Sequence, residues 1–182
     1  MAARQGTAVG FCLAAMLAAA PAQATRPLPA AGAYDLGFSP GHSALRVVLL
    51  GIRNAQTSIL VAAYEFTSRP IASALVSAAH RGVKVYIVAD REESTKPYSL
   101  VRSLARQGVQ VRLNGNYRDL HDKFMVIDGL HVETGSFNFT AGADRSNAEN
   151  ALLLWNVKPM ADAYAVQWRR LWNEGQDVPP GA

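Results

Sequence analysis

The sequence predicts an α/β domain with a mixed, largely parallel β-sheet flanked by helices on both faces. Three observations lead to this fold class. Strand-like and helix-like patterns alternate over residues 33–113, Asp128-Gly129 marks a hairpin, and an apolar stripe at helical spacing closes the chain over residues 160–172. Alternating strands and helices form right-handed crossovers between parallel strands, whereas a two-residue turn forces antiparallel pairing.

Hydrophobic periodicity defines the elements in the first two thirds of the chain. Strands are expected at 33–38, 58–64, 83–90 and 109–113, and helices at 43–55, 69–81 and 96–107. Gly82 and Gly108 can end two of these helices. A Pro/Ala/Gly-rich stretch, residues 25–32, is expected to be a flexible lead. One domain is therefore expected over residues 33–175, with a tail at 176–182.

The Asp128-Gly129 hairpin joins strands at 121–127 and 130–137. A two-residue turn would place Ile127 opposite Leu130, and by the same register Lys123 opposite Thr134. Alternation along the strands then gathers five polar residues on one face at one end of the hairpin. These are His121, Lys123, Thr134, Ser136 and Asn138. Below them, the same face is expected to carry Met125, Ile127, Leu130 and Val132.

A last strand and a last helix complete the domain. The strand is expected at residues 151–157. The apolar stripe of the helix consists of Met160, Tyr164, Trp168, Leu171 and Trp172.

The first 24 residues have the composition of a secretory signal peptide. Arg4 is their only charge, residues 8–20 form a short apolar core, and Ala22-Gln23-Ala24 is a small-x-small cleavage site. The apolar run is shorter than the roughly 20 residues that span a bilayer, so cleavage near Ala24 is expected, with a retained anchor as the alternative. The protein is then exported to a periplasm or to the medium.

Cysteine and charge limit the chemistry of the exported chain. Cys12, the only cysteine, lies within the signal segment, so the mature chain would have no disulfide, no thiolate nucleophile and no cysteine-type zinc site. The formal net charge of the full 182 residues is +4, which is compatible with a polyanionic partner such as nucleic acid or an anionic lipid surface.

A set of polar residues with fixed spacing carries the functional signal. His121-x-Lys123 is followed, after four intervening residues, by Asp128, then by Gly135-Ser136-x-Asn138 and by Glu149. This pattern resembles the HxKxxxxD motif of the phospholipase D superfamily, and with GSFNFT and NAEN it is most similar to the small Nuc-type bacterial endonucleases, which carry one motif per chain. The resemblance extends over about residues 33–175.

The resemblance implies a phosphodiesterase that works through a phosphohistidine. His121 would be the nucleophile, Lys123 and Asn138 would bind the phosphoryl oxygens, and Ser136 would assist them. Glu149 would hydrogen-bond a catalytic imidazole and fix its tautomer. Asp128 belongs to the motif, but its position in the turn favours a structural role. No metal or other cofactor is implied, because lysine and asparagine take the place of divalent cations.

The number of histidines has a consequence for assembly. The family mechanism uses two motif histidines, one to attack phosphorus and one to protonate the leaving oxygen. The other three histidines of this chain, His42, His80 and His131, are not followed by lysine two residues later. The second catalytic histidine is therefore expected from another copy of the chain, in a homodimer with the active site on its twofold axis.

Three functions are compatible with the sequence. The first is a metal-independent, nonspecific endonuclease that cleaves DNA and also RNA. The second is a phospholipase D or phosphatidyltransferase acting on lipid phosphodiesters, although the lipid enzymes of the superfamily typically carry two motifs in a longer chain. The third is a catalytically silent binding module, which the complete set of motif residues disfavours.

Overall fold

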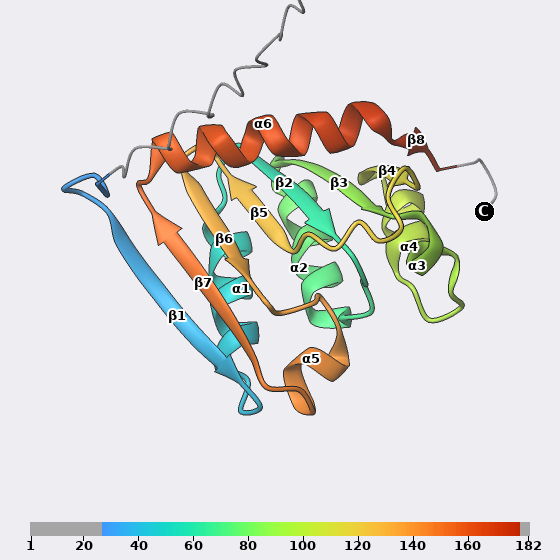
Figure 1. The fold of residues 1–182 in the computed structure, drawn as a ribbon, viewed down its shortest axis with the longest axis horizontal. Helices are drawn as coiled ribbons and strands as arrows, with labels where there is room; N and C mark the ends of the chain where they lie inside the picture. Colours follow the sequence, from blue (N-terminus) through green and yellow to red (C-terminus); the bar gives the residue numbers. More distant parts are fainter. Residues whose placement is uncertain (1–26, 179–182) are drawn as a thin grey trace, which may run out of the picture.

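The computed structural model describes residues 27–178, which form one eight-stranded sheet covered by helices (Figure 1). The strands are β1 (Ala33–Ser39), β2 (Ser58–Ala63), β3 (Lys84–Asp90), β4 (Gln110–Asn114), β5 (Phe124–Ile127), β6 (His131–Gly135), β7 (Glu149–Trp155) and β8 (Gln176–Asp177). The helices are α1 (Ser43–Asn54), α2 (Arg69–His80), α3 (Arg91–Thr95), α4 (Val101–Arg106), α5 (Ala141–Arg145) and α6 (Lys158–Glu174).

The sheet is mixed, as expected, but less of it is parallel than the sequence predicted. Its strand order is β1-β7-β6-β5-β2-β3-β4-β8. Only β2 with β3 and β3 with β4 pair in parallel, and all other neighbours are antiparallel. The prediction joined β1 to β2 by a parallel crossover. Instead β5, β6 and β7 lie between them, because alternation along a chain does not specify which strands become neighbours.

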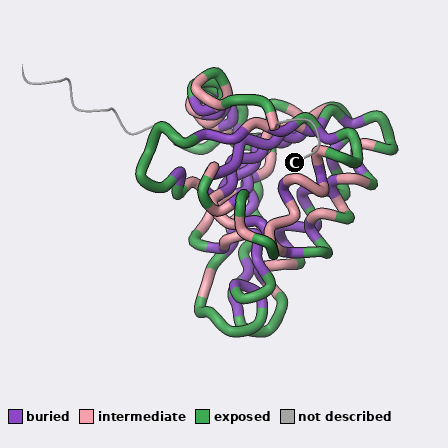
Figure 2. The backbone as a smooth tube through the Cα atoms, turned by 90° about the vertical axis from the view of Figure 1, so that its right-hand side faces the viewer, coloured by how far each residue is buried: buried purple, intermediate pink, exposed green. Residues whose placement is uncertain are grey.

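Helices cover both faces of the sheet, which confirms that prediction. Residues of α1, α2 and α4 pack on one face around Val48, Leu75 and Leu104. On the other face α6 crosses the strands alone, and the Trp168 indole donates a hydrogen bond to the Val61 carbonyl (2.9 Å). Figure 2 shows the buried segments running through the middle of the molecule between exposed turns.

The helix expected at residues 96–107 is shorter than predicted. Within this range only α4 forms, from Val101 to Arg106, and an irregular stretch around Pro97 separates it from the preceding short helix α3. Lys96, which precedes the proline, has an extended backbone (ψ 142°). Proline has no N–H to donate and disfavours the helical conformation in the residue before it, so the helix begins only at Val101.

The hairpin register differs by one residue from the prediction. Asp128 and Gly129 form the turn with positive φ angles of 56° and 62°, and the Leu130 N–H bonds to the Ile127 carbonyl (3.0 Å). Leu130 is then left out of the ladder, because its carbonyl accepts from the Val157 N–H (2.9 Å). Ile127 therefore pairs with His131, and Phe124 pairs with Thr134.

This slip changes which side chains share a face. Met125 and Ile127 pack on the α1 side, whereas Val132 packs on the α6 side. The expected apolar face of Met125, Ile127, Leu130 and Val132 is therefore wrong, since a slip of one residue exchanges the faces of one strand relative to the other.

The ends of the domain differ slightly from the predicted boundaries. β8 extends the sheet beyond residue 175, where Asp177 accepts a hydrogen bond from Arg112 (2.9 Å). The predicted signal peptide, residues 1–24, lies outside the described residues. Within residues 27–178, no helix is both long and apolar enough to cross a membrane.

Candidate active site

One end of the sheet gathers the motif residues. At this end, called the site end below, β1, β2 and β6 finish while β5 and β7 begin. His121 and Lys123 precede β5, Ser136 and Asn138 follow β6, and Glu149 opens β7. Four residues of the predicted cluster, His121, Lys123, Ser136 and Asn138, therefore lie at one end of the sheet, with His121 and Lys123 just outside the hairpin ladder. Thr134 does not join them as predicted, because it pairs with Phe124 on the face that α6 covers.

His121 is an exposed side chain in direct contact with the buried Lys123. The Lys123 ammonium lies 2.7 Å from His121 Nδ1 and donates to the His121 carbonyl (2.6 Å). An ammonium has no acceptor, so Nδ1 must accept, and a neutral imidazole then carries its proton on Nε2. The Tyr64 ring packs against the imidazole, with centroids 4.6 Å apart.

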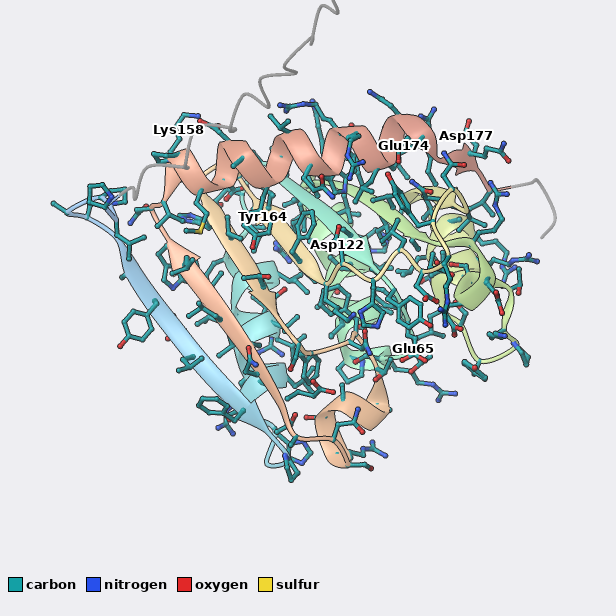
Figure 3. The ribbon with its side chains drawn as sticks, viewed as in Figure 1. Glu65, Asp122, Lys158, Tyr164, Glu174 and Asp177 are labelled. Atoms are coloured by element: carbon teal, nitrogen blue, oxygen red, sulfur yellow. The ribbon has the colours of Figure 1, made fainter. Side chains whose placement is uncertain are left out.

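The Lys123 side chain is buried, so its ammonium is largely shielded from solvent. Burial lowers the pKa of its ammonium, although the carboxylates of Asp122, Glu149 and Glu65 act in the opposite direction. In Figure 3, Asp122 lies close to α6 and Glu65 lies beyond the end of β2. A partly desolvated ammonium binds an anion such as a phosphoryl oxygen more strongly than an exposed one does.

Ser136 and Glu149 form a second part of the site. The Ser136 hydroxyl donates to Glu149 Oε2 (2.5 Å) and accepts from the Asn150 backbone N–H (3.1 Å). The other oxygen of Glu149 accepts from the Asn147 amide (2.9 Å). Both carboxylate oxygens are thus bound within the chain, and the expected bond from Glu149 to an imidazole stays a prediction.

Asn138 has an unused hydrogen-bonding group. Its side-chain Oδ1 is buried and has no partner among the described residues. Its backbone carbonyl accepts from the Thr140 N–H (2.7 Å), which fixes the turn after β6. Half a turn of the amide would place its NH2 group there instead, where it could donate to a phosphoryl oxygen.

Asp128 is separated from the other predicted site residues, because it lies in the turn at the far end of β5. Its carboxylate accepts from the backbone N–H groups of Gln56, Thr57 and Ser58 and from the Thr57 hydroxyl. Burial raises its pKa, but these hydrogen bonds outweigh burial and hold the pKa below the ordinary 3.8. This geometry fits a structural role.

Sequence reasoning missed the residues that hold the loop before His121. The Asp90 carboxylate caps α3 through the Glu93 N–H and also accepts from the Leu120 N–H, both at 2.9 Å. On the other side of His121, Gln167 of α6 donates to Asp122 (3.3 Å). The cap at Asp90 is local and has a sequence signal, an Asp followed three residues later by Glu, but the contacts with Leu120 and Gln167 join distant segments, so no local pattern could have found them.

The described residues 27–178 contain no group of three or more His, Cys, Asp and Glu side chains that could hold a metal ion. What the site end offers instead is an imidazole, a desolvated ammonium, a hydroxyl and an amide. Such a set of side chains, gathered at one end of a mixed α/β sheet, belongs to the class of sites that bind a phosphoryl group through side chains and not through a metal.

Comparison with known proteins agrees with this class. The family model "Cardiolipin synthase, PLD-like domain" matches residues 48–172. The chain therefore belongs to the phospholipase D superfamily of phosphodiesterases, and the resemblance seen in the motif is confirmed.

Relatives and solved structures support the same assignment. A phospholipase D of Rickettsia felis is 35% identical over 131 residues, which are 72% of this chain and 65% of the relative. A mitochondrial cardiolipin hydrolase of Xenopus laevis is 35% identical over 132 residues, which are 72% of this chain and 62% of the relative. The match thus spans less than two thirds of these relatives' lengths.

Two solved structures match over almost their entire length. Nuc from Salmonella typhimurium, a phospholipase D family member, has a TM-score of 0.79 and 40% identity, covering 81% of this chain and 98% of that one. NucT from Helicobacter pylori has a TM-score of 0.74 and 25% identity, covering 81% and 99%. The fold class is confirmed by these matches.

Proposed function

We propose that the protein is an exported, metal-independent and nonspecific endonuclease that cleaves DNA, and also RNA, through a phosphohistidine. The observation that carries this proposal is the pairing of exposed His121 with buried Lys123 beside Ser136 and Asn138. The overlap with 98% of the Nuc chain supports the nuclease assignment over a lipid one, because this chain, like the Nuc-type endonucleases it resembles, carries a single motif in a short domain.

The contacts of Lys123 suggest how substrate would activate His121. In the free chain the ammonium bonds to Nδ1, which keeps the imidazole proton on Nε2. A bound phosphodiester competes for this ammonium and draws it away from the ring. Nδ1 is then free to take the proton, and the Nε2 lone pair becomes available to attack phosphorus.

The chemistry requires a nucleophile and a separate group that transfers protons. His121 Nε2 forms the bond to phosphorus while the leaving oxygen departs with a proton from the second histidine. That histidine, now neutral, removes a proton from water, which attacks phosphorus and releases His121. We assign the second role to His121 of another copy, because the chain has no second His-x-Lys pair.

An exposed apolar surface supports the homodimer. Tyr34, Leu36 and Phe38 alternate along the edge strand β1 and are 68%, 48% and 57% exposed. Tyr34 and Leu36 pair with Leu154 and Leu152, so they lie on the face that α6 covers further along. A second copy packed on this face would bury them beside the site end.

A lipid substrate remains the second candidate function. The relatives that are 35% identical carry the names phospholipase D and mitochondrial cardiolipin hydrolase. Residues 1–24, with their apolar core and small-x-small site, support export in either case.

The test is cleavage of supercoiled plasmid by residues 25–182 in excess EDTA. His121→Ala should abolish nicking, whereas His80→Ala, an exposed histidine at the end of α2, should leave it unchanged. Phosphatidyl lipid vesicles form the parallel arm. An intact plasmid with hydrolysed lipid would reject the nuclease in favour of the second candidate. Equal nicking by wild type and His121→Ala would also reject the nuclease proposal.

A further inference from the structure

Charge is distributed unevenly on the two sides of the catalytic histidine. On one side, the Tyr64 ring packs at a tilt against His121, and acidic groups lie around it. Its pKa is raised by burial and then by the carboxylates of Glu93, Asp119, Asp90 and Glu65. This acidic side is formed by the end of β2, the α3 segment and the loop before β5. A polyanion that crossed it would meet several negative charges.

The other side of the site end carries positive charge. His42 lies in the β1–α1 connection, and its Nδ1 is 2.8 and 2.9 Å from the two oxygens of Asp144 in α5. The Asp144 side chain is only 9% exposed, whereas that of His42 is 62% exposed. The buried carboxylate therefore orients the imidazole from within and leaves Nε2 facing solvent.

Two arginines flank this histidine. Arg46 follows one helical turn later, where its N–H bonds to the His42 carbonyl (3.0 Å), and Arg145 follows Asp144 directly. Both are exposed, and neither forms an ion pair with another residue in the described part of the chain. His42, Arg46 and Arg145 together are called the α1–α5 corner below.

The α1–α5 corner adjoins the catalytic residues. Ser39, three residues before His42, pairs with Glu149 across β1 and β7, and Cα atoms so paired lie about 5 Å apart. Glu149 in turn bonds to Ser136. Figure 1 shows α5 and the β1–α1 connection together at one end of the site, with α3 toward the other.

His42 also holds an unfavourable backbone conformation. Its φ of 65° and ψ of 2° lie in the left-handed region, which costs a non-glycine residue roughly 1 kcal/mol or more. Asn, which tolerates this region best among side chains of similar polarity, can therefore replace His42 without adding strain.

From these observations we propose that the nucleic-acid strand next to the scissile phosphate leaves the active site across the α1–α5 corner, where His42, Arg46 and Arg145 bind its phosphates. This inference rests on the proposed nuclease function. The acidic side around Tyr64 repels the strand from α3, so the substrate follows one preferred path across the site.

The test compares two substrates. A labelled single-stranded oligonucleotide carries phosphates beyond the scissile one, whereas bis(p-nitrophenyl) phosphate carries none. The variants are His42→Asn and the double variant Arg46→Gln/Arg145→Gln. The control is Arg118→Gln, at another exposed arginine, whose Nε lies 3.5 Å from Asp119 Oδ2 on the acidic side.

For the oligonucleotide, the double variant should raise KM about tenfold with kcat unchanged, and the salt dependence of log KM should become shallower by about 0.7 for each lost contact. His42→Asn should raise KM less. Hydrolysis of bis(p-nitrophenyl) phosphate should stay unchanged in all variants, and Arg118→Gln should match the wild type on both substrates.

Two results would overturn the inference, and they differ. If the wild type cleaves the oligonucleotide but the double variant keeps its KM and salt dependence, the α1–α5 corner does not bind the strand. If the wild type hydrolyses bis(p-nitrophenyl) phosphate but not the oligonucleotide, the nuclease function fails and the inference with it.

Discussion

Glu133 on β6 provides the sharpest test of the packing, because it is an acid in the core. It lies between Met125 of β5 and Leu153 of β7, is 1% exposed, and its Oε2 has no hydrogen-bond partner among the described residues. Burial raises the pKa of this carboxyl from 4.5 to about 8, so the folded protein keeps Glu133 protonated at neutral pH.

The effect on stability follows from the two pKa values. The unfolded chain releases the proton near pH 4.5, whereas the folded chain holds it up to about pH 8, so stability is lost as pH rises between these values. At pH 7 the free energy of unfolding is lower by about 3 kcal/mol, at about 1.36 kcal/mol for each pH unit above 4.5. Glu133→Gln cannot ionise at this position, so its free energy of unfolding should not fall in this way.

Urea unfolding of both proteins from pH 4.5 to pH 8 measures this difference. The advantage of Glu133→Gln over the wild type should grow by about 3 kcal/mol between pH 4.5 and pH 7 and level off above about pH 8. Glu92→Gln, at an exposed glutamate, should follow the wild-type profile. A difference between wild type and Glu133→Gln that does not change with pH would refute the reasoning.

Three further predictions concern the site and its supports. Asp128→Asn should lose about 1–2 kcal/mol of unfolding free energy above pH 4, discounted for partial exposure, and the difference from wild type should shrink as pH falls below 4 toward the lowered pKa; a difference that does not change with pH in this range would contradict the prediction. Asp90→Ser keeps an N-cap for α3 but cannot reach the Leu120 N–H. Its kcat should therefore fall about as far as that of Asp90→Ala, whereas only the alanine variant should lose thermal stability. A serine variant with wild-type kcat would exclude a positioning role for Asp90. Mixing unfolded wild type and His121→Ala before joint refolding should give activity that falls as the square of the wild-type fraction, whereas a linear fall would argue against a shared site.

Much of the fold could be read from local sequence patterns. Most strands and helices begin and end within a few residues of the expected positions, because hydrophobic periodicity and helix-ending glycines act locally. Gly82 and Gly108 adopt positive φ angles of 91° and 86° where they end α2 and α4. The expectation failed at residues 96–107, where Pro97 outweighed the apolar spacing.

The hairpin shows why register was harder to predict. The Asp-Gly turn itself formed, with a hydrogen bond between Ile127 and Leu130. The residue after the turn, however, bonds to Val157 at the start of α6 and leaves the ladder. A contact from a segment 27 residues away thus shifted the pairing by one residue, and no pattern within the hairpin encodes it.

The sequence by itself determined the proposed site residues, since the identities and spacing of His121, Lys123, Ser136, Asn138 and Glu149 are a property of the chain. Only the tertiary structure decided their environment. It buried Lys123, placed Asp128 away from the site, tied Asp90 to the loop before His121, and set acidic and basic surfaces on opposite sides of the histidine. The desolvation of a side chain and the charges around it depend on which distant segments pack together. Tertiary packing decides this, and the spacing of residues along the chain does not.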